Sequence, residues 1–170
     1  PQAYAAAVGG WWWLMGGGNP GRTPVRAFSL LMLLGAAVMT GKIARRFAAP
    51  GREGVADLIA VGTVLLLPLC NGLARHFMPE GLLVFATAAS VWAALRLAER
   101  PSPGRAWVLG AAIGWGLLSK QTFVLVGAIP LLYLVANPLR RHPRSVLFIA
   151  LGLAAVAGPW VATHLGAQVG

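Results

Sequence analysis

Few charged residues interrupt this apolar chain, and two short groups of them have the chemistry to bind an anion. The segment Arg75 to Glu80 begins with an arginine and a histidine and ends with a carboxylate. Lys120 lies between Ser119 and Gln121, where two apolar runs meet. A guanidinium makes bidentate hydrogen bonds to phosphate oxygens and an ammonium acts as a point charge. Arg75 and Lys120 together therefore suit a phosphate group.

Three of the candidate residues also have a structural explanation, and both interpretations stay open from the sequence. Glu80 follows Pro79, where a helix is expected to begin, and a carboxylate there is stabilised by the helix dipole. Lys120 is also explained as an ordinary loop lysine. A lysine between apolar runs nevertheless costs free energy unless its charge is paired or hydrated. Snorkelling to the membrane surface is the simpler explanation for Arg26. The candidate substrate-binding set is Arg26, Arg75, His76, Glu80 and Lys120.

Other kinds of site have no candidates in the sequence. It contains no nucleotide-binding loop and no zinc motif, and its three histidines are far apart, at His76, His142 and His164. We therefore expect no metal ion and no cofactor. The acids number four, Glu53, Asp57, Glu80 and Glu99, and no two of them share the predicted outer face, so no carboxylate pair is available for acid–base catalysis. We expect Glu53 and Asp57 to meet nearby basic residues or to favour a helix N-terminus.

The composition excludes a soluble domain. Hydrophobic residues make up 58% of the 170 residues and charged residues 11%, against ~25% charged in ordinary soluble proteins. The net charge of +10 does not indicate nucleic-acid binding, because the basic residues lie at the ends of apolar runs, as the positive-inside rule describes. The single cysteine, Cys70, allows no internal disulfide.

The apolar runs predict an all-α polytopic membrane bundle in a single integral membrane domain, 1–170. Residues 1–24 are expected to form an outer interfacial helix and loop. The tryptophans Trp11 to Trp13 favour headgroup depth, and the apolar run 4–15 is too short to cross the hydrocarbon core. A truncated span is the alternative. Residues 25–166 are expected to form about six transmembrane helices. The six runs are Val25 to Gly41, Val55 to Ala74, Gly81 to Leu95, Ala106 to Ser119, Gln121 to Leu139 and Ser145 to Leu165.

The connections between these runs predict the topology. Ten basic residues fall on one side if each run is a separate span: Lys42, Arg45, Arg46, Arg52, Arg96, Arg100, Arg105, Arg140, Arg141 and Arg144. Four fall on the other side: Arg22, Arg26, Arg75 and Lys120. The positive-inside rule makes the larger group cytoplasmic.

Residues 106–136 are ambiguous, because they also read as one long apolar helix. A single helix of this length would reach ~46 Å, well beyond the ~30 Å hydrocarbon core, and would put two basic loops on opposite faces. We therefore predict a hairpin with Lys120 at its outer tip. Gly110 and Gly114 have the spacing that lets membrane helices approach closely, although plain glycine use explains them equally well. Pro68, Pro130 and Pro159 are interpreted as kinks.

One segment of the sequence resembles a motif of a known family. Gly110 to Gln121, reading Gly-Ala-Ala-Ile-Gly-Trp-Gly-Leu-Leu-Ser-Lys-Gln, resembles the G-x-x-x-G-x-x-x-L-[ST]-K segment of GT-C glycosyltransferases. The protein mannosyltransferase and aminoarabinose transferase relatives, glycosyltransferase family 39, are the most similar. Pro1 to Tyr4, Val25-Arg26, Lys42 to Arg46, and Pro68 with Arg75-His76 and Glu80 follow the family's order of motifs across nearly the whole chain.

The resemblance implies an enzyme that moves a sugar from a polyprenyl-phosphate donor to an unidentified acceptor at the non-cytoplasmic face of the membrane. The family's general base is an acid in the first outer loop, which would precede Pro1, so no catalytic residue is assigned here. Because the chain begins at Pro1 without a charged leader, we expect an internal piece of a longer protein. Glu80 replaces an aspartate of many relatives, and Pro1-Gln2 has one proline where two are common, so the resemblance leaves the subfamily and the sugar open.

The expected location is a bacterial plasma (inner) membrane. The excess of arginine over lysine and the abundance of Ala, Gly and Leu indicate a GC-rich bacterial genome. Two rival functions stay open. A multi-pass transporter or flippase for a lipid-linked or anionic substrate would use broken helices and charges at the membrane midplane, which the apolar runs lack. A structural membrane subunit would leave Lys120 and Arg75 replaceable.

The charge asymmetry generates a test of the topology. Single cysteines at positions 45, 100 and 141, in a chain with Cys70 replaced, are expected to react with an impermeant thiol reagent only from the cytoplasmic side. Cysteines at positions 12, 76 and 120 should react only from the outer side. Labelling of positions 100 and 141 from opposite sides would rule out the hairpin at Lys120.

Overall fold

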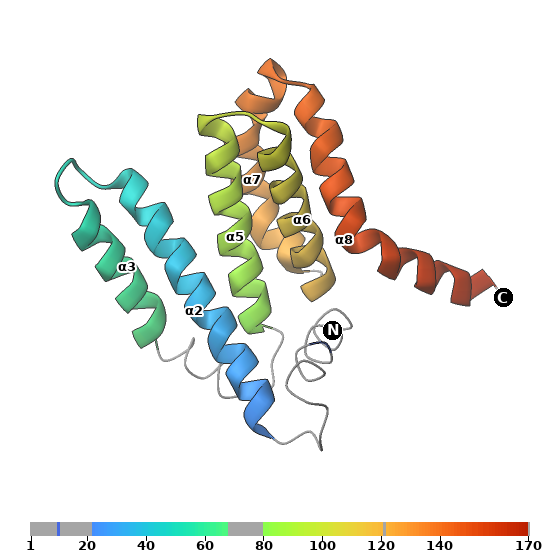
Figure 1. Cartoon of the computed structure of the whole chain (residues 1–170), viewed down its shortest axis with the longest axis horizontal. Coiled ribbons are helices and arrows are strands. Elements are labelled where there is room, and N and C mark those ends of the chain that lie inside the picture. Colours follow the sequence, from blue (N-terminus) through green and yellow to red (C-terminus); the bar gives the residue numbers. More distant parts are fainter. Residues whose placement is uncertain (1–9, 11–21, 68–79, 121, 170) are drawn as a thin grey trace.

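Every element that the structure describes is a helix (Figure 1). The computed structural model of the chain describes residues 10, 22–67, 80–120 and 122–169. Its helices are α2 (Arg22–Phe47), α3 (Glu53–Leu66), α5 (Glu80–Glu99), α6 (Pro103–Ser119), α7 (Thr122–Arg141) and α8 (Arg144–Val169). Each overlaps one predicted apolar run, so the predicted all-α membrane bundle is confirmed.

The lengths of the helices differ more than the prediction of about six spans implied. Of the described helices, four are long and apolar enough to cross a membrane, over Arg26–Phe47, Gly81–Glu99, Thr122–Arg141 and Arg144–Ala162. Helices α3 and α6 have 14 and 17 residues, which correspond to about 21 and 26 Å, less than the ~30 Å hydrocarbon core. The predicted interfacial helix at Trp11 to Trp13 and the end of the second run, with Pro68, lie outside the described residues.

The surface of the bundle is apolar, as a lipid-facing surface must be. Large hydrophobic side chains stand almost fully exposed, among them Tyr133, Leu66 and Leu125, with exposed fractions of 84%, 80% and 78%. In water, exposure on this scale would favour aggregation. The buried positions, in contrast, are mostly small residues such as Ala36, Ala94 and Ala106. Small side chains let the helix backbones approach closely, which is how helices associate in lipid.

Glycines bring α6 and α8 together along the most extensive helix contact of the bundle. A side chain added at Gly110 would overlap the backbone carbonyl of Ile149, and one at Gly152 would overlap that of Trp107. At Gly114 an added Cβ would lie 3.1 Å from the carbonyl oxygen of Leu153. The close approach that the Gly110 and Gly114 spacing suggested is therefore confirmed.

Ion pairs join α2 to its two neighbours. Nη1 of Arg45 lies 3.4 Å from Oδ2 of Asp57 on α3, which confirms the expectation that Asp57 meets a nearby basic residue. A Cβ at Gly41 would collide with this same carboxylate, so the glycine makes room for it. Arg46 forms an ion pair with Glu99 on α5.

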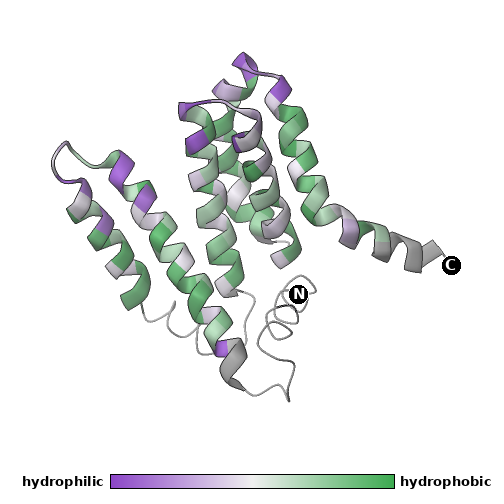
Figure 2. Cartoon of the chain, in the orientation of Figure 1, coloured by the Kyte–Doolittle hydropathy of each residue, from purple (hydrophilic) through white to green (hydrophobic). Residues whose placement is uncertain are grey.

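The three basic connections lie together at one end of the bundle (Figure 1), where the hydrophilic colour is concentrated in Figure 2. They are the α2–α3, α5–α6 and α7–α8 connections. In the α5–α6 connection, Nη1 of Arg105 donates to the carbonyls of Arg96 at 2.9 Å and Arg100 at 3.0 Å. The hydroxyl of Ser102 accepts from the Arg105 backbone N–H at the start of α6. One arginine thus closes the end of α5 and fixes the turn into α6.

Helices α6 and α7 are separate, as the length argument predicted. Helix α6 ends at Ser119 and α7 begins at Thr122. The turn between them lies at the end opposite the basic connections (Figure 1). Of the predicted kinks, Pro130 lies inside α7 and Pro159 inside α8, and Figure 1 shows α8 changing direction in its second half, where Pro159 is found.

The glycine contact between α6 and α8 leads to a stability prediction. Gly110→Ala should destabilise the bundle by about 1–3 kcal/mol, because the new methyl group would overlap backbone that has no room to move. Gly62→Ala is the matched control, since nothing lies within 4 Å of its Cβ position and alanine is the better helix former. Thermal unfolding in detergent micelles would compare the two midpoints, and equal midpoints would contradict the close contact.

Candidate functional site

The turn that carries Lys120 is built by hydrogen bonds on both sides of that residue. Lys120 has an extended backbone, with φ −161° and ψ 139°, and ends α6 by donating its N–H to the carbonyl of Gly116. Its own carbonyl accepts from the N–H of Phe123 at 3.0 Å. The adjacent Ser119 is fully buried, and its hydroxyl donates to the carbonyl of Trp115 at 2.7 Å. The lysine is thus half-buried on a backbone that is held in place.

Phe123 packs the first turn of α7 against the last turn of α6. Its side chain is 2% exposed, and its ring occupies the space that a side chain at Gly116 would fill. Because Gly116 has no side chain, the ring of Phe123 packs against α6 at that position. Lys120 is hydrogen-bonded through its backbone to both residues. This packing determines where the Lys120 backbone lies relative to the rest of α6 and α7.

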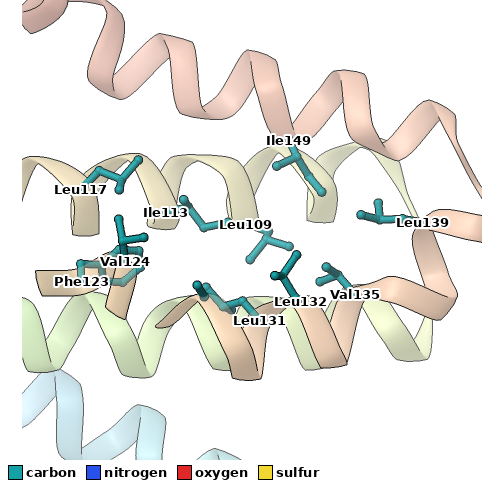
Figure 3. Close-up of a pocket in the computed structure, with 11 residues that line it drawn as sticks. Leu109, Ile113, Leu117, Phe123, Val124, Leu131, Leu132, Val135, Leu139 and Ile149 are labelled. Carbon is teal, nitrogen blue, oxygen red and sulfur yellow. The ribbon is translucent and has the colours of Figure 1, made fainter. Parts of the chain in front are cut away.

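An apolar groove opens between α6 and α7 beside this turn (Figure 3). Its volume is about 300 Å³. It extends from Leu117 and Phe123, next to the turn, toward Leu139 near the far end of α7 (Figure 3). All of its lining side chains are apolar; the others are Leu109, Ile113, Val124, Ala128, Leu131, Leu132, Val135 and Ile149. The lining offers no polar group to a ligand, so the groove is complementary to apolar groups.

The structure brings part of the predicted binding set to one end of the bundle. Arg26, near the start of α2 and exposed, the backbone of Glu80, at the start of α5, and the Lys120 turn all lie opposite the basic connections (Figure 1). Helix α5 packs against both α2, which carries Arg26, and α6, which ends at the Lys120 turn. Arg75, His76 and the side chain of Glu80 lie outside the described residues. Among the described residues no cluster of His, Cys, Asp or Glu is suited to a metal ion.

Two features were missed by reasoning from the sequence. The groove gives no sequence signal, because α6 and α7 are apolar on nearly all sides and the lining residues do not stand out from those that face lipid. The second feature is the pair of basic residues around Trp92, at the basic end of the bundle. The spacing of Trp92 and Arg96, four residues apart near the end of an apolar run, is the signal that would have pointed to half of it.

The sequence is similar to known proteins. The sequence profile of the family described as dolichyl-phosphate-mannose-protein mannosyltransferase matches residues 13–165. The lipid A galacturonosyltransferase RgtD of Rhizobium johnstonii is 33% identical over 135 residues, which are 78% of this chain and 27% of that protein. The chain thus spans about a quarter of the length of this curated relative. None of the solved structures gives a significant match.

The chain belongs to the dolichyl-phosphate-mannose-protein mannosyltransferase family, a GT-C family, because the family profile covers most of its residues. The resemblance inferred from the Gly110 to Gln121 segment is therefore confirmed.

Proposed function

We propose that this chain is part of a membrane glycosyltransferase, which moves a sugar from a polyprenyl-phosphate donor to an acceptor at the non-cytoplasmic face of a bacterial plasma membrane. Membership of the family supports sugar transfer, and the family description itself names a lipid-phosphate-linked sugar. The relative RgtD is named for transfer of galacturonosyl groups to lipid A. The two names differ in the acceptor, protein in one and lipid A in the other, so the proposal concerns the donor.

One observation carries the proposal, namely that the apolar groove ends beside the Lys120 turn. A polyprenyl phosphate has a long hydrocarbon chain and an anionic head, and the groove and the lysine match these two parts. The groove would hold the isoprenoid units nearest the head, while the ammonium would contact the phosphate. The hydrogen-bonded turn fixes the Lys120 backbone before the donor arrives, which lowers the entropy cost of binding.

The other candidate residues have supporting roles in this proposal. Arg75 would bind the phosphate oxygens bidentately next to Lys120. The polar opening of the site, where the sugar would be bound, would be lined by Arg26, His76 and Glu80. All three are predicted to lie on the outer side of the membrane. None of them is proposed as the catalytic base.

Substitutions at Lys120 and Arg75 test the donor role in the full-length protein. Lys120→Ala and Arg75→Ala should each raise the KM for the lipid-linked donor by about tenfold or more, because a charged hydrogen bond contributes ~1.5–3 kcal/mol. Lys120→Arg should recover part of the loss, since the charge is retained. Sugar transfer would be measured against donor concentration at matched protein levels in the membrane.

Arg140→Ala is the control, because Arg140 is exposed near the end of α7 at the basic side of the bundle. It is expected to transfer sugar with the parental KM. Parental donor dependence in Lys120→Ala would instead identify Lys120 as an ordinary loop lysine and overturn its phosphate role.

A further inference from the structure

One aromatic ring gathers two basic side chains at the basic end of the bundle. Nζ of Lys42 lies 5.7 Å from the centroid of the Trp92 ring, and Cζ of Arg96 lies 5.3 Å from it. Both distances are within the ~6 Å over which an aromatic face attracts a cation. Arg96 follows Trp92 by one turn of α5, whereas Lys42 belongs to α2. The cluster therefore exists only because α2 packs against α5.

Among the residues that the structure describes, carboxylates pair with two neighbouring arginines and not with these two cations. Arg45 pairs with Asp57 and Arg46 pairs with Glu99. No carboxylate among the described residues pairs with Lys42 or Arg96. Four basic residues thus face two acidic ones, which leaves a local charge of +2 from these six residues. Two like charges beside one ring repel each other, and an anion that contacts both would reduce that repulsion.

The cluster lies near the depth of the lipid headgroups. Lys42 and Arg96 are both within about a turn and a half of the end of a candidate span, and both are exposed while Trp92 is half-buried. Basic side chains this close to a helix end extend toward the polar headgroups. An indole prefers the same depth. A lipid phosphate is therefore the anion that these side chains would meet first.

We propose that Lys42, Trp92 and Arg96 form a binding site for the phosphate headgroup of an anionic phospholipid, in the leaflet at the basic end of the bundle. The Arg96 guanidinium donates to two phosphate oxygens and the Lys42 ammonium to one. A zwitterionic lipid fits less well, because its own ammonium group would be repelled by the local positive charge and would compete for a ring that two protein cations already use. The site is independent of the proposed sugar transfer, which is located at the opposite end.

Native mass spectrometry of the purified full-length protein tests this site. The protein would be equilibrated with equal amounts of phosphatidylglycerol and phosphatidylcholine, and the ratio of the two lipids retained would be measured. The double variant Lys42→Gln with Arg96→Gln should lower the preference for phosphatidylglycerol by about tenfold. The variant Trp92→Leu, which keeps every charge, should lower it by about threefold, because the ring no longer holds the two cations together.

Arg140→Gln with Arg141→Gln is the matched control, since it removes two exposed charges from another basic connection. Its lipid preference should stay within about twofold of the parent. An equal loss in both double variants, or an unchanged preference in Trp92→Leu, would mean that diffuse surface charge attracts the lipid and would overturn the proposed site. Inorganic phosphate and glycerol phosphate, added at millimolar concentration, should not displace phosphatidylglycerol; displacement would indicate a site for a free phosphate.

Discussion

The bundle depends on how closely its helices can approach one another. Lipid tails are as apolar as leucine, so burying leucine between two helices gains little hydrophobic free energy in a membrane. Packing contacts must supply the association instead, and they are made where small residues allow the backbones to meet. Gly110 and Gly152 provide this at the crossing of α6 and α8. Gly41 allows α3 to bring Asp57 against α2.

This constraint also shapes the proposed donor site. The second half of α6 contains Gly114 and Gly116, and the ring of Phe123 from the next helix packs at Gly116. That contact ties the beginning of α7 to the end of α6 at Lys120, while α7 otherwise packs mainly against α5. The two consecutive helices therefore meet at the turn and separate beyond it, and the apolar groove lies where they separate (Figure 3). The groove and the held lysine have the same structural origin.

The two ends of the bundle have different chemistry. The basic end carries most of the positive charge in three tight connections, where Arg105 closes α5 and ion pairs join α2 to α3 and α5. The opposite end carries few charges, among which Lys120 lies beside the groove. This division separates the charges that orient the chain in the bilayer from the end where the donor site is proposed.

Charge and apolar patterning by themselves determined the membrane class, the positions of the helices and the division of the basic residues between two ends. These properties follow from the length of each apolar run and from where charges interrupt it, both of which are local in sequence. The glycine-containing segment before Lys120 also pointed to the family. Tertiary structure alone decided which helices are neighbours, because helices that are apolar on nearly all sides do not mark the face that meets a partner. Hence the groove between α6 and α7, and the placement of Lys42 beside Trp92 and Arg96, emerged only when the helices were packed together.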